Sequence, residues 1–86
     1  MNTIRNQIET YILSTFMVGI DPEILQNDTS LEREHIVDSA GMLEIILFIE
    51  ETFSISVENE DAVPDNFDTI DAMTAYVERK LTELAP

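Results

Sequence analysis

The sequence predicts an all-α fold, a bundle of three main helices and one short helix with a long loop between the first two. Three segments carry apolar residues at the three-and-four spacing of an amphipathic helix, and no segment has a convincing partner strand. With 86 residues, the chain is expected to form one domain over residues 1–86. It contains no cysteine, which excludes disulfides, thiolate metal sites and cysteine nucleophiles.

The first helix is predicted over residues 4–16, where an apolar residue recurs at every fourth position: Ile4, Ile8, Ile12 and Phe16. Residues 18–37 lose this periodicity and contain glycine, proline and asparagine, so they are expected to form a long ordered loop. A loop of about 20 residues needs side chains that hold it to the core. The candidates are its scattered apolar residues, Ile20, Ile24, Leu25, Leu31 and Ile36.

The second helix is expected to begin at Asp38 or Ser39 and to end near Phe53, with an apolar face formed by Met42, Ile45, Ile46, Ile49 and Phe53. Residues 55–57 form an extended connector, and residues 58–67 hold a short helical turn within a loop. The last helix starts at Asp68 or Thr69, and its apolar positions continue to Leu84.

The chain is strongly acidic, with 18 acidic and 4 basic side chains and a net charge of −14. Twelve of the acids lie between residues 34 and 78, and this stretch has no lysine or arginine. Nucleic acids and anionic membranes are polyanions, so a basic partner protein is the expected partner. The longest apolar run, residues 45–49, is far shorter than the roughly 20 residues of a membrane helix, and a cytoplasmic protein is expected.

The outer face of the second helix mixes carboxylates with apolar side chains. Glu44 and Glu51 lie almost in line there, and the residues around them are Ala40, Leu43, Leu47, Phe48 and Glu50. One interpretation is a docking strip for a basic, grooved partner. In the other, Leu47 and Phe48 pack under the long loop, and the acids form an ordinary solvated face. Both stay open at this point.

Ser39 stands where the long loop meets the second helix. A serine there ordinarily caps the helix, but an anion on its oxygen would also be stabilised by the helix N-terminus. The segment Asp38-Ser39-Ala40-Gly41 resembles the attachment motif of acyl and peptidyl carrier proteins. The resemblance covers about residues 4–84 and includes Asp28-Thr29-Ser30-Leu31, Glu44, Ile49-Glu50-Glu51, Phe53, Val57, Glu60-Asp61, Asn66-Phe67-Asp68-Thr69-Ile70 and Tyr76-Val77.

This resemblance implies an acyl-carrier-type bundle in which a phosphopantetheinyl transferase moves a 4′-phosphopantetheine arm from coenzyme A to Ser39. The thiol of the arm would hold an acyl or aminoacyl group as a thioester. An adenylating ligase would load that group, downstream acyl-transferring or modifying enzymes would use it, and the carrier would act as a monomer. The residues implied in recognition by the transferase and other partners are Asp38, Ala40, Glu44, Leu47, Glu50 and Glu51, and those that could shelter the cargo are Ile46, Ile49 and Phe53.

Two positions depart from the fatty-acid carriers that the sequence resembles. Ala40 stands where many of them have leucine, and Ile36 replaces the glycine usually found two residues before the aspartate. The Asp-Ser-x-Gly form is similar to D-alanyl carriers and other stand-alone carriers, which favours aminoacyl or special acyl cargo over a fatty-acid role. In this comparison, Gly41 is interpreted as leaving room for a partner or for the arm.

Three other functions compete with a carrier. A serine hydrolase would need a base, but His35 is the only histidine and Gly-x-Ser-x-Gly is absent, so no catalytic residue is expected. Calcium binding by residues 58–71 lacks the central glycine and terminal glutamate of an EF-hand loop, so no metal site is expected. An unmodified acidic interaction adaptor or a nucleic-acid mimic would use the same surface without Ser39, and the adaptor is the alternative to a carrier.

Overall fold

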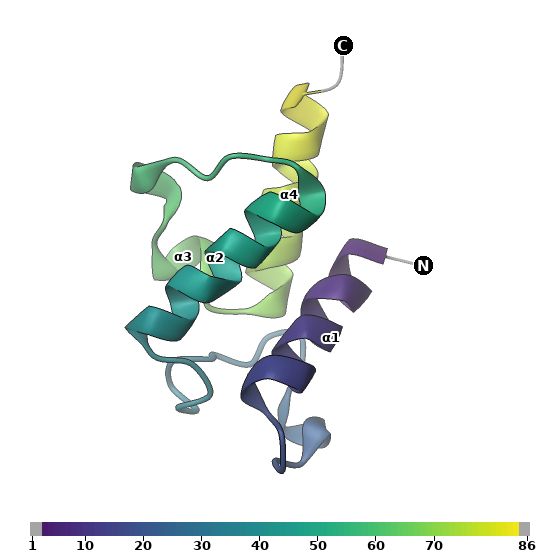
Figure 1. Ribbon diagram of the computed structural model, residues 1–86, viewed down its shortest axis with the longest axis vertical. Helices are drawn as coiled ribbons and strands as arrows, with labels where there is room; N and C mark the ends of the chain where they lie inside the picture. Colours follow the sequence, from purple (N-terminus) through teal and green to yellow (C-terminus); the bar gives the residue numbers. More distant parts are fainter. Residues whose placement is uncertain (1–2, 85–86) are drawn as a thin grey trace.

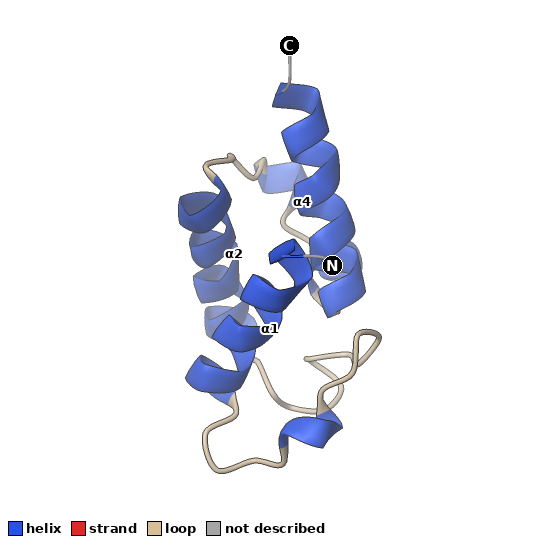
Figure 2. Ribbon diagram, turned by 90° about the vertical axis from the view of Figure 1, so that its right-hand side faces the viewer, coloured by secondary structure: helices blue, strands red, loops and turns tan. Residues whose placement is uncertain are grey.

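The computed structural model describes residues 3–84, and within them it contains helices and no strand (Figures 1 and 2). The elements follow in the order α1 (Thr3–Phe16), η1 (Pro22–Ile24), α2 (Ser39–Phe53), η2 (Asn59–Asp61), α3 (Pro64–Phe67) and α4 (Ile70–Leu84), where η marks a short 3-10 helix. The expected all-α bundle, with its long first loop and short α3, is confirmed. None of the helices in residues 3–84 has the length and apolar character needed to cross a membrane.

Local hydrogen bonds explain where the helices begin and end. The Asp38 side chain accepts a hydrogen bond from the Gly41 N–H at 2.8 Å, so Asp38 caps α2 and Ser39 is its first residue. Ser54 ends α2 in the left-handed conformation. The Thr69 hydroxyl accepts from the Ala72 N–H at 3.0 Å and caps α4 in the same way. The two helix starts expected from the sequence are therefore placed to within one or two residues.

The buried apolar residues form one core cluster, to which each of the three long helices contributes one face. The α1 and α4 helices pack against each other, and α3 packs on α4. The predicted core face of α2 is buried at Ile45, Ile46 and Ile49, whereas Met42 and Phe53 are half-buried at its edges. The other buried members include Ile8, Ile12, Phe67, Ile70, Met73, Tyr76 and Val77.

The long loop, residues 17–38, crosses one end of the bundle (Figure 1). The predicted anchors Leu25 and Leu31 are buried, but Ile20 and Ile24 are 42% and 46% exposed, so that part of the prediction is wrong. The reason is local: Pro22 begins the 3-10 turn η1, capped by the Asp21 side chain, and this turn lies at the surface. Ile24 is the last residue of this surface turn, and Ile20 lies in the exposed turn that follows α1, where its N–H donates to the Met17 carbonyl at 3.0 Å.

Polar groups also close the loop against the junction of α3 and α4. The Asp68 carboxylate accepts hydrogen bonds from the Glu32 N–H at 3.0 Å and from the Ser30 hydroxyl. The Asp68 carbonyl accepts a further one from the Leu31 N–H at 2.9 Å. This set of bonds is called the Asp68 clasp below. It holds the chain just before α2 and so helps to fix the position of Ser39.

Gly41 lies where α2 packs closely against the long loop and the end of α1. A Cβ atom there would come within 2.8 Å of Val37 Cγ1 and 3.1 Å of Phe16 Cε1. The first turn of α2 therefore approaches the end of α1 and the loop too closely for alanine. Room for a partner or an arm is not needed to explain this glycine, and internal packing replaces that interpretation.

Candidate functional site

Ser39 is exposed at the first position of α2, and the capping position belongs to Asp38. The interpretation of Ser39 as an ordinary cap is therefore wrong. Within residues 3–84, no side chain is hydrogen-bonded to the Ser39 hydroxyl. The oxygen is open to solvent at the positive end of a helix of 15 residues, where backbone N–H groups favour a negatively charged substituent.

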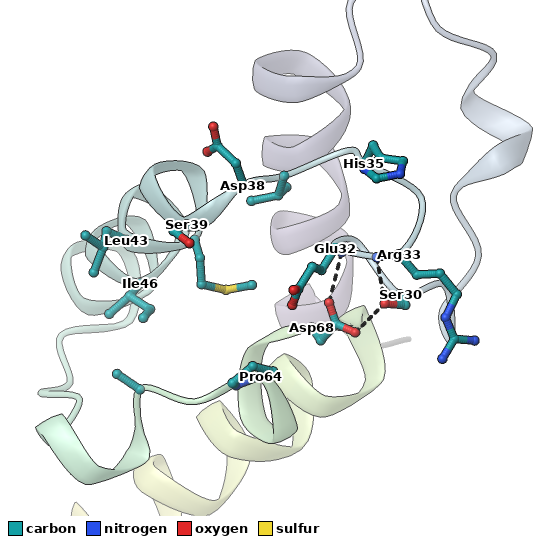
Figure 3. A pocket seen from close by; sticks show the side chains of 13 residues that line it. Ser30, Glu32, Arg33, His35, Asp38, Ser39, Leu43, Ile46, Pro64 and Asp68 are labelled. Carbon is teal, nitrogen blue, oxygen red and sulfur yellow. Dashed lines mark hydrogen bonds between the residues drawn. The ribbon is translucent and has the colours of Figure 1, made fainter.

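An open cavity of about 1060 Å³ borders Ser39 (Figure 3). It lies between the start of α2, the end of the long loop and the start of α3. One side is mostly apolar and is formed by Val37, Met42, Leu43, Ile46, Ala62 and Pro64. The other side is polar and is formed by Ser30, Glu32, Arg33, His35 and Asp68. A group attached to Ser39 would thus have an apolar surface immediately beside it.

Helical spacing explains how α2 contributes to this cavity. Met42, Leu43 and Ile46 follow Ser39 by three, four and seven positions, so all four residues share one side of the helix. Sequence reasoning assigned Met42 to the core and overlooked this relation, although the spacing was available to show it. Of the proposed shelter residues, only Ile46 borders the cavity: Ile49 is fully buried in the core, and Phe53 lies at the far end of α2.

The polar residues that border the cavity mostly form hydrogen bonds that hold the long loop in place. Both oxygens of the Asp68 carboxylate are engaged in the Asp68 clasp. His35 has a left-handed backbone, with φ of 58°, and lies in the loop away from Ser39 (Figure 3). No hydrogen bond joins His35 to Ser39 in the described chain. Residues 3–84 also contain no group of three or more histidine, aspartate or glutamate side chains arranged to hold a metal ion.

The outer face of α2 presents most of the predicted recognition residues to solvent. Ala40, Glu44 and Glu51 are exposed, and the Leu47 side chain is 56% exposed. Within residues 3–84, neither Glu44 nor Glu51 forms an ion pair. Glu50 differs, because it is half-buried and its Oε2 atom accepts a hydrogen bond from the Val57 N–H at 2.9 Å. Its carboxylate is committed to the connector that follows α2.

Phe48 does not belong to this exposed face. Its ring stacks on Tyr11 of α1, with centroids 3.9 Å apart and planes 9° apart, and meets Phe53 edge-on. Leu47 is exposed and Phe48 packs against α1, so neither residue lies under the long loop as one interpretation required. Burial, and secondarily the charge of Glu44, raise the pKa of the Tyr11 phenol.

Comparison with known proteins finds two similar chains, both named as acyl carriers. A protein named "Probable acyl carrier protein PigG", from Serratia sp., is 28% identical over 76 residues, which cover 88% of this chain and 86% of that protein. The acyl carrier protein of Bdellovibrio bacteriovorus is 27% identical over 63 residues, which cover 73% and 78% of the two chains. No protein-family model matches the chain. Both similarities support the resemblance to carrier proteins drawn from the sequence.

Proposed function

We propose that this chain, which resembles acyl carrier proteins over most of its length, holds an acyl or aminoacyl group on a 4′-phosphopantetheine arm attached to Ser39. The observation that carries the proposal is that Ser39 is exposed at the first position of α2 and does not cap the helix, because Asp38 does so. An ordinary capping serine would have its oxygen occupied by the helix backbone.

Attachment requires a separate transferase, because this chain supplies a nucleophile without an adjacent base. A bond forms from Ser39 Oγ to phosphorus as the bond to adenosine 3′,5′-bisphosphate breaks, and the hydroxyl proton passes to the transferase. The N-terminus of α2 then stabilises the charge of the phosphate. Asp38 caps α2 through Oδ1, and its other carboxylate oxygen would help to bind the magnesium of the transferase. When bound, the arm supplies the thiol that a chain without cysteine lacks.

Recognition falls to the outer face of α2, next to the attachment point. Glu44 and Glu51 offer unpaired carboxylates, and Leu47 offers an apolar contact between them. Such a face suits the transferase, an adenylating ligase and later acyl-transferring enzymes with basic docking sites. Glu50 takes a lesser part, because its carboxylate holds the connector. The chemistry then belongs to the partner enzymes, and the carrier acts as a single monomeric domain in the cytoplasm.

The experiment is intact-mass measurement after incubation with coenzyme A, magnesium and a broad-specificity phosphopantetheinyl transferase. The wild-type chain should gain the mass of one phosphopantetheine group. Ser39→Ala should gain none, while the control Ser56→Ala, at another exposed serine, should be modified like the wild type. An unmodified adaptor predicts no gain in any variant, and an unchanged wild-type mass across several transferases would refute the proposal.

A further inference from the structure

The segment between α2 and α3 forms one wall of the cavity beside Ser39. Ala62, near the end of this segment, and Pro64, the first residue of α3, form this wall and line the cavity together with Leu43 and Ile46 of α2. The segment has little regular structure, containing only the single turn η2 before α3 begins. Few apolar side chains anchor it: Ile55 is buried and Val57 is half-buried, whereas Ala62 and Val63 are exposed. Its position therefore depends on a small number of specific hydrogen bonds.

The bond nearest to the wall joins Asp61 to the core. The Tyr76 hydroxyl, on α4, donates to Asp61 Oδ2 at 2.9 Å. Asp61 is also held by its backbone, whose carbonyl accepts from the Asn66 side-chain amide at 2.9 Å. Asp61 directly precedes Ala62 in the sequence, so the hydrogen bonds that hold Asp61 also fix the position of the cavity wall.

Tyr76 is itself held in place by burial and by ring packing. Only 1% of the residue is exposed, and its ring packs against Phe67 with centroids 5.1 Å apart. The Arg79 guanidinium lies over the ring, 5.1 Å from its centroid. Burial, followed by the hydrogen bond to Asp61, raises the pKa of Tyr76 to about 12, so the phenol keeps its proton in ordinary buffers.

We infer that Asp61 and Tyr76 are positioning residues that hold the 59–64 segment against the cavity and thereby shield a group carried on Ser39 from water. The shielding rests on the proposed function, whereas the positioning of the wall does not. The other tether of the segment, Glu50 to Val57, lies at its start. The Tyr76 phenol also has a hydrogen bond with the Glu58 backbone, so its hydroxyl holds the segment at both Glu58 and Asp61. Apart from these contacts, the hydrogen bonds that residues 59–66 make within the described chain are local ones in η2 and α3.

The first measurement is amide hydrogen exchange on the unmodified chain. Tyr76→Phe removes the hydroxyl and keeps the ring on Phe67, so the core is expected to stay folded. Loss of one such bond should speed exchange of the Ala62, Val63 and Asn66 amides about tenfold, with little change in α1. Asp61→Ala should do the same, and Asp61→Asn, which keeps an acceptor oxygen, should restore much of the protection. Asp65→Ala, which removes an exposed acid in α3 directly after the segment, is the matched control.

The second measurement is hydrolysis of the thioester on chains loaded from hexanoyl coenzyme A by a transferase. Tyr76→Phe and Asp61→Ala should lose the hexanoyl group several-fold faster than the wild type and Asp65→Ala. Faster exchange without faster hydrolysis would overturn the shielding, and unchanged exchange would overturn the positioning. If no chain takes up the arm, the proposed function fails, while the exchange data still decide whether Tyr76 holds the wall.

Discussion

Two pairs of acids in this chain have the same charge and opposite surroundings. Asp61 and Asp68 are half-buried, and each accepts a hydrogen bond from a residue 15 or more positions away. Glu44 and Glu51 lie exposed on the outer face of α2 and form no ion pair within residues 3–84. The first pair closes loops, whereas the carboxylates of the second pair are exposed to solvent. The net charge of −14 is thus divided between structural and exposed carboxylates.

Because the two pairs have different surroundings, we expect substitutions in them to affect stability differently. Removing a structural carboxylate leaves its donors without a partner, which costs stability. Removing an exposed carboxylate from so acidic a chain relieves repulsion and should cost no stability at all. Stability and recognition can therefore be altered separately, by choosing which acid to change.

The largest effect on stability is expected for Asp68→Ala, which opens the Asp68 clasp. The Ser30 hydroxyl and the Glu32 N–H both lose their acceptor, so the free energy of unfolding should fall by about 2–3 kcal/mol. Urea denaturation measures the change. The control Asp65→Ala, three positions earlier and exposed, should stay within about 0.5 kcal/mol of the wild type. Equal losses for the two variants would erase the distinction between structural and exposed acids.

A smaller effect is expected from alkaline pH, through the bond between Tyr76 and Asp61. The pKa of Tyr76 rises from 10.0 to about 12 in the folded chain, so folding favours the neutral phenol. This contribution to stability is complete below pH 10 and is lost as the pH rises through about 12. Tyr11, whose pKa is also raised, adds a loss in the same direction.

Urea denaturation between pH 8 and pH 12 tests this assignment. Tyr76→Phe has no phenol at this position, so its stability should fall less steeply with pH than that of the wild type. A parallel fall in both chains would show that Tyr76 does not cause the alkaline loss.

The smallest effect on stability is expected on the outer face of α2. The double variant Glu44→Gln and Glu51→Gln should unfold within about 0.5 kcal/mol of the wild type. Its modification at Ser39 by a transferase should nevertheless be slower and less sensitive to salt, because two steering charges are gone. The control Glu60→Gln and Asp65→Asn removes the same charge elsewhere. If the two double variants are modified at the same rate, α2 is not the docking surface.

The sequence predicts the features of this fold that are local. Helix positions follow from the 3.6-residue period, and the resemblance to the attachment motif of carrier proteins is visible in the sequence at Asp38 and Ser39. The anchors of the long loop were only partly predicted, because Ile20 and Ile24 lie in two surface turns, one after α1 and one at Pro22, and stay exposed. The structural roles of Asp61 and Asp68 could not be predicted, because their hydrogen-bond partners lie 15 to 38 residues away and no sequence pattern links the partners.

The central claim, that Ser39 is the attachment point, is tested most directly by peptide mapping of the chain after expression with a transferase. Trypsin releases residues 34–79 as one peptide, which contains Ser39, Ser54 and Ser56. Fragmentation should place a single phosphopantetheine group on Ser39 and leave the other two serines unmodified. A group found on Ser54 or Ser56, or an unmodified peptide beside an active transferase, would contradict the account.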